Sequence, residues 1–257
     1  MNRLSLSASG NRTLRVDSAS PLEEARRSPG SSEFLPHYSL FSPLHYEPNY
    51  AYPLIIWLHG PRDNEHQLRR VMPLISLRNY AAIGPRGTAR SPEGAPGFTW
   101  TSHSGSVSAA ERAVLDCLEV AQHRFHIDPQ RVFLAGYDAG GTMAFQIGLR
   151  HPSRFAGVVS LGGPFPQGRM LLSSLPQIRR LPLLITHGRD ARLYPVDQLC
   201  NDLRLFHTAG LSVTVRQYPC GDELTTKMLQ DLNTWLMEQV TGQKQESSAV
   251  PVMDDRN

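Results

Sequence analysis

The chain has 257 residues, of which 40% are hydrophobic and 19% are charged, as in a soluble globular protein with enough apolar residues for a core. Its formal net charge is only +3, and its basic residues are scattered in pairs, which argues against nucleic acid as a partner. No apolar run is long enough to span a membrane, and the start of the chain lacks the apolar segment of a secretory signal.

The three cysteines, Cys117, Cys200 and Cys220, have no metal-ligand spacing and leave one unpaired if two form a disulfide. They are typical of free thiols in a reducing compartment. We therefore expect a cytoplasmic protein with no metal and no cofactor.

The two ends of the chain differ in composition from its middle. Residues 1–34 are rich in Ser and Arg without periodicity, which predicts a disordered leader. Residues 242–257 are polar and predict a disordered tail. A single domain is expected over residues 35–241.

Apolar runs and helical periodicities alternate along this domain. They predict strands at 38–41, 53–58, 81–84, 132–135, 155–161, 181–186 and 212–218, and helices at 65–77, 106–125, 142–147, 196–209 and 223–240. Ser106 or Ser108 could cap the second helix. A Gly/Pro/Ser-rich loop, residues 85–105, carries Trp100 and His103. This alternation predicts an α/β fold, a mostly parallel sheet with helices on both faces.

The sequence RVFLAGYDAGG, residues 131–141, is the most informative stretch of the chain. A short apolar strand leads into a glycine-rich turn, and a helix follows. This is the setting of the nucleophile elbow, G-x-S-x-G, in which glycines allow a strained turn to raise the central side chain above the sheet. Here the central residue is Asp138. The sequence therefore predicts the turn without its serine nucleophile.

Four stretches resemble the phospholipase/carboxylesterase branch of the α/β-hydrolases, which is related to bacterial esterases and polyester depolymerases. They are YPLIIWLHG (52–60), DPQRVFLAGYDAGGTMA (128–144), HPSRFAGVVSLGGPFP (151–166) and LLITHGRDARLYP (183–195). The resemblance runs from about residue 38 to 240 and implies an α/β-hydrolase fold.

The resemblance also implies where a catalytic triad would lie. The family's serine falls on Asp138, its acid on Ala191 and its histidine on Asp222. Asp190 is one residue early for the acid. A carboxylate at position 222 cannot act as an imidazole at neutral pH without a large change of pKa.

The oxyanion loop departs from the family pattern as well. After Gly60 the family has a residue whose backbone N–H stabilises the oxyanion, and then a glycine; here these are Pro61 and Arg62. Proline has no N–H, and loss of one such donor costs about a hundred- to thousand-fold in turnover. The second expected donor, the N–H of Ala139, is still present.

Together the changes favour a pseudoenzyme, in which the pocket serves binding or structure and its ligand is an unknown small molecule or protein. The alternative is a hydrolase that uses Asp138 as nucleophile, with His103 as its base. Trp100, His103 and Asp190 are candidate pocket residues, and Cys220 is a less favoured replacement nucleophile.

Asp138 and Asp222 are expected to lie close together, where two carboxylates cannot both ionise freely. Arg62 could neutralise the pair. Alternatively, Arg62 points to solvent and backbone N–H groups hold the carboxylates. A divalent metal is a weaker third possibility.

Overall fold

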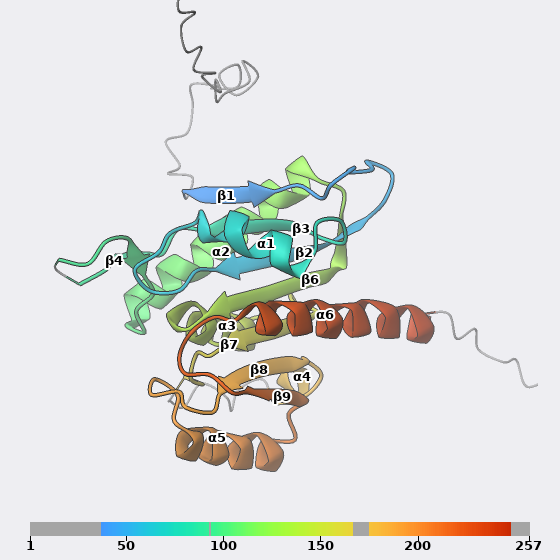
Figure 1. Ribbon diagram of the computed structural model, residues 1–257. Helices are drawn as coiled ribbons and strands as arrows, with labels where there is room; N and C mark the ends of the chain where they lie inside the picture. The colour runs from blue at the N-terminus through green and yellow to red at the C-terminus, as the bar shows by residue number, and fades with distance from the viewer. Residues whose placement is uncertain (1–36, 93, 167–174, 248–257) are drawn as a thin grey trace, which may run out of the picture. The chain divides into compact units, whose positions relative to one another are not determined.

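A seven-stranded sheet, in the order β1-β3-β2-β6-β7-β8-β9, forms the centre of the protein (Figure 1). The computed structural model describes residues 37–92, 94–166 and 175–247. The strands are β1 Tyr38–Phe41, β2 Tyr52–Leu58, β3 Ala81–Pro85, β6 Ile127–Tyr137, β7 Gly157–Leu161, β8 Leu183–Gly188 and β9 Val213–Tyr218. Strand β1 pairs antiparallel with β3, and the other neighbouring pairs are parallel. The predicted, mostly parallel sheet is confirmed.

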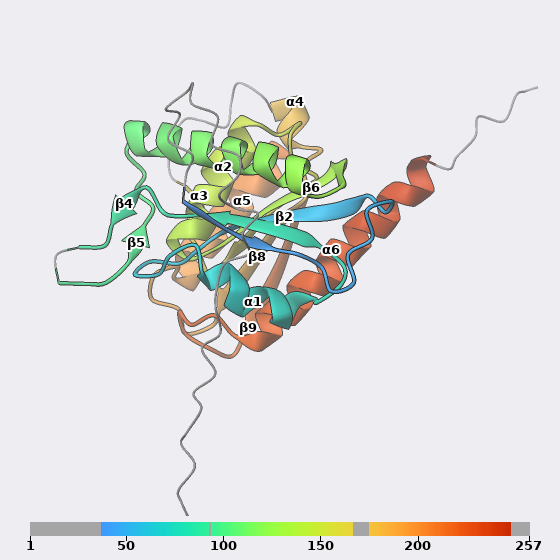
Figure 2. The same ribbon diagram turned by 90° about the horizontal axis from the view of Figure 1, so that it is seen from above.

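Helices cover both faces of this sheet (Figure 2). On one face lie α1 Gln67–Ile75 and α6 Thr226–Ser247; on the other lie α2 Ser104–Arg124, α3 Ala139–Arg150, α4 Leu175–Ile178 and α5 Val196–Ala209. Strand β2 shows why its sequence is a continuous apolar run. Ile55 and Trp57 belong to the core beneath α1 and α6, whereas Leu54 and Ile56 belong to the core beneath α2 and α3.

The structure differs from the sequence prediction at several places; strand β6, for example, begins at Ile127 and not at residue 132. Helix α2 begins at Ser104, before both predicted caps, because His103 is extended and its carbonyl accepts a hydrogen bond from Val107 N–H at 2.9 Å. Helix α6 runs to Ser247, past the predicted start of the tail at 242. The predicted leader, residues 1–34, and residues 248–257 lie outside the described residues.

Another difference is in the loop predicted over residues 85–105. It contains a small hairpin, β4 Ala89–Arg90 and β5 Phe98–Thr99, which projects from the main sheet (Figures 1 and 2). The guanidinium groups of Arg86 and Arg90 lie over the Phe98 ring at 4.8 and 5.8 Å from its centroid. Such cation–π contacts stabilise the hairpin. They produce no hydrophobic periodicity in the sequence, so the hairpin could not be predicted from it.

Candidate functional site

Asp138 lies in the turn between β6 and α3, at the carboxyl end of a central strand. Its backbone has φ 51° and ψ −119°, which a residue other than glycine rarely adopts. The N–H of Asp138 donates to the Leu161 carbonyl at 2.9 Å, and its own carbonyl accepts from Thr142 N–H at 3.0 Å. Asp138 therefore lies at a strand-to-helix turn, as the glycine pattern predicts.

Three glycines allow the chain to pack closely around this turn. A Cβ atom on Gly136 would lie 2.4 Å from the carbonyl oxygen of Gly140, and one on Gly140 would lie 2.2 Å from that of Leu58. A Cβ atom on Gly141 would lie 2.3 Å from Ser160 Oγ. These separations are far shorter than van der Waals contact, so the packing around the elbow requires glycine.

A cavity of about 260 Å³ opens above Asp138. It is lined by Trp100, Ser102, Asp138, Ala139, Thr142, Met143, Pro164 and Leu193. Of the three predicted pocket residues, Trp100 lines this cavity, whereas His103 and Asp190 are exposed and do not. Pro164 and Leu193 come from loops after β7 and β8, and no local sequence pattern connects them to the elbow.

Partial burial raises the pKa of the Asp138 carboxyl group above its ordinary value. The negative charge of Asp222 raises it further, while the backbone N–H of Ala139 acts in the opposite direction. The two carboxylates therefore interact electrostatically. Asp138 has no ion pair with any residue in the part of the chain that the structure covers.

Asp222 is held by the backbone of the loop that follows β8. Its Oδ1 accepts hydrogen bonds from the N–H groups of Arg192 and Leu193, both at 3.0 Å. The Tyr137 hydroxyl donates to the Asp222 backbone carbonyl at 2.6 Å. The carboxylate of Asp222 thus stabilises the loop that contains Ala191, and the sequence resemblance predicts the histidine and the acid of a triad at these two positions.

The hypothesis that Arg62 neutralises the two carboxylates is wrong. Arg62 is exposed, has φ 62°, and forms no ion pair within the described ranges. An exposed guanidinium keeps its hydration, which favours solvent over a partly buried site. The alternative, backbone N–H groups, agrees with the contacts of Asp222.

The loop at the predicted oxyanion position forms a hydrogen bond with α1, the helix that follows it. The Gly60 N–H donates to Gln67 Oε1 at 3.1 Å, and the same oxygen accepts from Trp57 Nε1 at 2.9 Å. Pro61 offers no N–H. Sequence reasoning missed Gln67, because its role depends on contacts that only the fold creates.

Two buried histidines near the strand ends have structural roles. His59 Nε2 accepts from Gly87 N–H at 2.8 Å, so its Nδ1 is the nitrogen that donates to the Gly60 carbonyl at 2.7 Å. Burial lowers the pKa of His59, which favours the neutral ring that this acceptor role of Nε2 requires. His187 Nε2 donates to the Tyr194 carbonyl at 2.8 Å, and Gln217 Nε2 lies 3.4 Å from its Nδ1.

Cys220 is poorly suited to nucleophilic attack. Desolvation raises the pKa of its thiol, and the negative charges of Glu223, Asp190 and Asp222 raise it further, so the thiolate is disfavoured.

Among residues 37–92, 94–166 and 175–247, no group of three or more His, Cys, Asp or Glu side chains could hold a metal ion. None of the helices in these ranges is long and apolar enough to cross a membrane.

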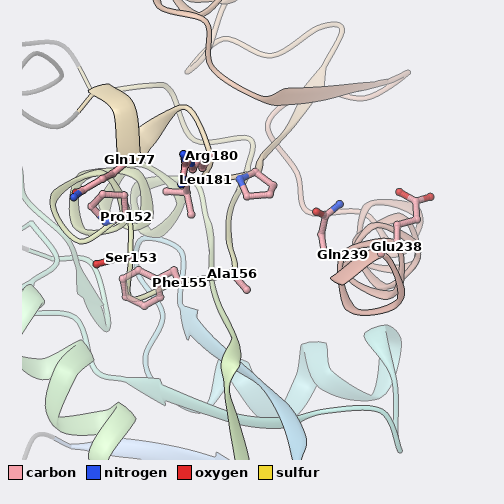
Figure 3. A pocket seen from close by; sticks show the side chains of 11 residues that line it. Pro152, Ser153, Phe155, Ala156, Gln177, Arg180, Leu181, Glu238 and Gln239 are labelled. Carbon is pink, nitrogen blue, oxygen red and sulfur yellow. The ribbon is translucent and has the colours of Figure 1, made fainter. Parts of the chain in front are cut away.

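A larger cavity, about 700 Å³, lies at the opposite end of the strands from Asp138. Figure 3 shows Gln177 and Arg180 on one side of it and Glu238 and Gln239 of α6 on the other. It lies beside the amino ends of β7 and β8. Ligands of open α/β sheets bind at the carboxyl ends of the strands, so the cavity above Asp138 is the better candidate.

A strained strand-to-helix turn at the carboxyl end of a parallel sheet defines the class of the α/β-hydrolases. Residues 47–239 match the phospholipase/carboxylesterase family, and since this match covers most of the chain, the protein belongs to that family.

Two proteins with related sequences are the carboxylesterase SOBER1 of Arabidopsis thaliana and an epoxide hydrolase of Caballeronia sordidicola. SOBER1 is 26% identical over 117 residues, which cover 45% of this chain and 51% of SOBER1. The epoxide hydrolase is 32% identical over 126 residues, which cover 48% of this chain and 34% of that enzyme. The chain thus spans about half the length of SOBER1 and about a third of the epoxide hydrolase.

Solved structures show the same fold at low sequence identity. The SOBER1 crystal structure has a TM-score of 0.63 and 21% identity, covering 74% of this chain and 100% of that one. The Bacillus cereus carboxylesterase has a TM-score of 0.65 and 17% identity, covering 81% and 96%. At these identities the likeness concerns the fold alone.

Proposed function

We propose that this protein has lost ester hydrolysis and uses the cavity above Asp138 to bind a ligand. The observation that carries the proposal is Asp222. Acyl transfer by this fold needs an imidazole at that position to move protons, and here a carboxylate accepts the backbone N–H groups of Arg192 and Leu193 instead.

Two further observations support this proposal. No histidine is among the described residues that line the cavity, and both ring nitrogens of the buried His59 and His187 face partners within the fold. The oxyanion loop supplies proline where a donor is needed.

The free thiols Cys117, Cys200 and Cys220 favour a reducing compartment, so we assign the protein to the cytoplasm.

An ester assay tests the loss of hydrolysis. The purified protein should not hydrolyse chromogenic esters of short and medium acids above the buffer rate, nor react covalently with a fluorophosphonate probe. The Bacillus cereus carboxylesterase, assayed in parallel, is the control for both reagents. A burst of product or a labelled band from this protein would overturn the proposal.

A second candidate function uses Asp138 as a nucleophile on carbon. It is favoured by the strained conformation of Asp138, by its position at the cavity, and by the likeness to an epoxide hydrolase. The carboxylate would open an epoxide to give an ester, which water must then hydrolyse with the help of a base. His103 would have to move, because it is exposed and does not line the cavity.

Intact-protein mass spectrometry distinguishes this second candidate. Incubation with small epoxides and haloalkanes would add the mass of the substrate fragment to the protein, and Asp138→Asn would prevent the addition. An unchanged mass and no diol or alcohol product reject this chemistry.

A further inference from the structure

The cavity above Asp138 has few free hydrogen-bonding groups. Trp100 Nε1 donates to the His59 carbonyl at 2.9 Å. Thr142 Oγ1 donates to the Pro164 carbonyl at 2.7 Å. These two donors of the wall are therefore already used within the fold.

The remaining wall is mainly apolar. Met143 and Pro164 contribute aliphatic surface, and the Trp100 indole adds an aromatic one. Leu193 lies at the opening and is 54% exposed, which is high for a large apolar side chain. A ligand with an apolar body would cover this surface and gain free energy from its burial.

Among the lining residues that the structure describes, Asp138 is the only one with a charged side chain. It has no cation partner among the residues that the structure describes, and Asp222 adds a second negative charge nearby. A partly buried carboxylate that lacks a cationic partner favours a ligand that donates hydrogen bonds and carries positive charge. An anionic ligand would be repelled by both carboxylates.

We propose that this cavity binds a small organic cation, in which a protonated primary amine contacts Asp138 and a short apolar body lies against Trp100, Met143 and Leu193. The size of the cavity, about 260 Å³, restricts the ligand to a small molecule or the end of a side chain. The inference rests on the proposed function, because a carboxylate that attacked its substrate would be a nucleophile and not a binding group.

Hexylamine, hexan-1-ol and hexanoate test this proposal, because they share an alkyl chain and differ in the head group. Each is titrated into ¹⁵N-labelled protein at neutral pH, and dissociation constants are taken from the amide shifts. Hexylamine should bind about ten-fold or more tightly than hexan-1-ol, the factor that a charge-assisted hydrogen bond supplies, and hexanoate should bind most weakly. Shifts should concentrate at residues 100–102, 138–143 and 193.

Two variants assign the preference to one carboxylate. Asp138→Asn should bind hexylamine and hexan-1-ol about equally. Glu223→Gln removes an exposed charge that does not line the cavity, and it should keep the preference for the amine. Equal binding of amine and alcohol by the unmodified protein, or equal loss in both variants, would overturn the proposal.

The outcome is independent of the ester assay. Amine binding together with ester turnover would reject the proposed loss of hydrolysis and leave this site in place. Absence of both turnover and amine preference would reject this site and leave the loss of hydrolysis supported.

Discussion

Two regions meet around Asp138, the elbow and the loops that face it, and they differ in how closely they follow the family's sequence pattern. The elbow retains its strained backbone and three glycines whose Cβ atoms would overlap neighbouring atoms. The loops that face it, at residues 60–62, 189–193 and 220–223, form hydrogen bonds within the fold at positions where the sequence resemblance predicts catalytic groups.

Under the proposed function, the strained turn and the reaction are separable. Strain at a backbone position is often part of a mechanism, and it persists only when the surrounding structure holds it. Here the hydrogen bonds from Asp138 N–H and to its carbonyl, together with the close glycine packing, are sufficient to hold the turn. A strained elbow geometry is therefore no evidence of turnover by itself.

The largest expected effect concerns the packing of the elbow. Gly140→Ala would place a Cβ atom 2.2 Å from the Leu58 carbonyl oxygen, and backbone cannot move as a flexible side chain can. We expect the free energy of unfolding to fall by about 4 kcal/mol or more, as for severe core overpacking. Chemical denaturation measures this.

Gly105→Ala is the matched control for that change. It lies in helix α2, and an added Cβ atom meets no heavy atom within 4 Å. Because alanine is the better helix former, the free energy of unfolding should rise by up to about 1 kcal/mol. Similar results for the two glycines would show that the elbow does not depend on close packing.

The second prediction concerns variants in which the family's expected catalytic residues are introduced one step at a time. Asp138→Ser alone should give no esterase activity, since under the proposed function base, acid and one oxyanion donor are still missing. Adding Ala191→Asp and Asp222→His should give measurable turnover of a chromogenic ester. Adding Pro61→Ala should raise it further, by at most the hundred- to thousand-fold that one oxyanion donor supplies. Activity in the single variant would reveal a base that the structure does not identify.

The sequence predicted the sheet because its buried strands are short apolar runs, as β2 and β8 show. It predicted the elbow because only glycine permits the contacts of Gly136 and Gly140. These features depend on residues close together in the chain. Both are local consequences of burial and of backbone geometry.

The partners of the site could not be predicted in this way. The N–H groups that bind Asp222 lie about thirty residues away in the chain, and Gln67 reaches Gly60 only because α1 packs beside β2. The interpretation of Arg62 as a cation for the carboxylates failed for the same reason. The direction of a side chain in a loop depends on the surrounding fold, and the residues adjacent in the sequence do not determine it.

The third prediction tests the structural role of Asp222. Asp222→Ala leaves the N–H groups of Arg192 and Leu193 without their acceptor, and we expect a loss of about 1–2 kcal/mol in the free energy of unfolding. Glu223→Ala, an exposed neighbour, should change it by less than about 0.5 kcal/mol. Thermal and chemical denaturation compare the two variants. Equal stability of both would mean that the facing loop does not depend on the carboxylate.

The smallest effect concerns the charge of Asp138. Partial burial raises the pKa of this carboxyl group in the folded state, so the folded protein binds its proton more tightly than the unfolded chain does. The contribution of the Asp138 carboxyl group to stability is therefore complete below the unfolded pKa of about 3.9, and it is lost as the pH rises through the higher folded pKa.

Asp138→Asn keeps the shape and, like Asp, tolerates positive φ, but it carries no charge. The variant should melt above the unmodified protein at neutral pH, and the two should converge near pH 4, with Asp222 present in both. A difference that is the same at every pH would assign the effect to packing at the elbow and not to the charge.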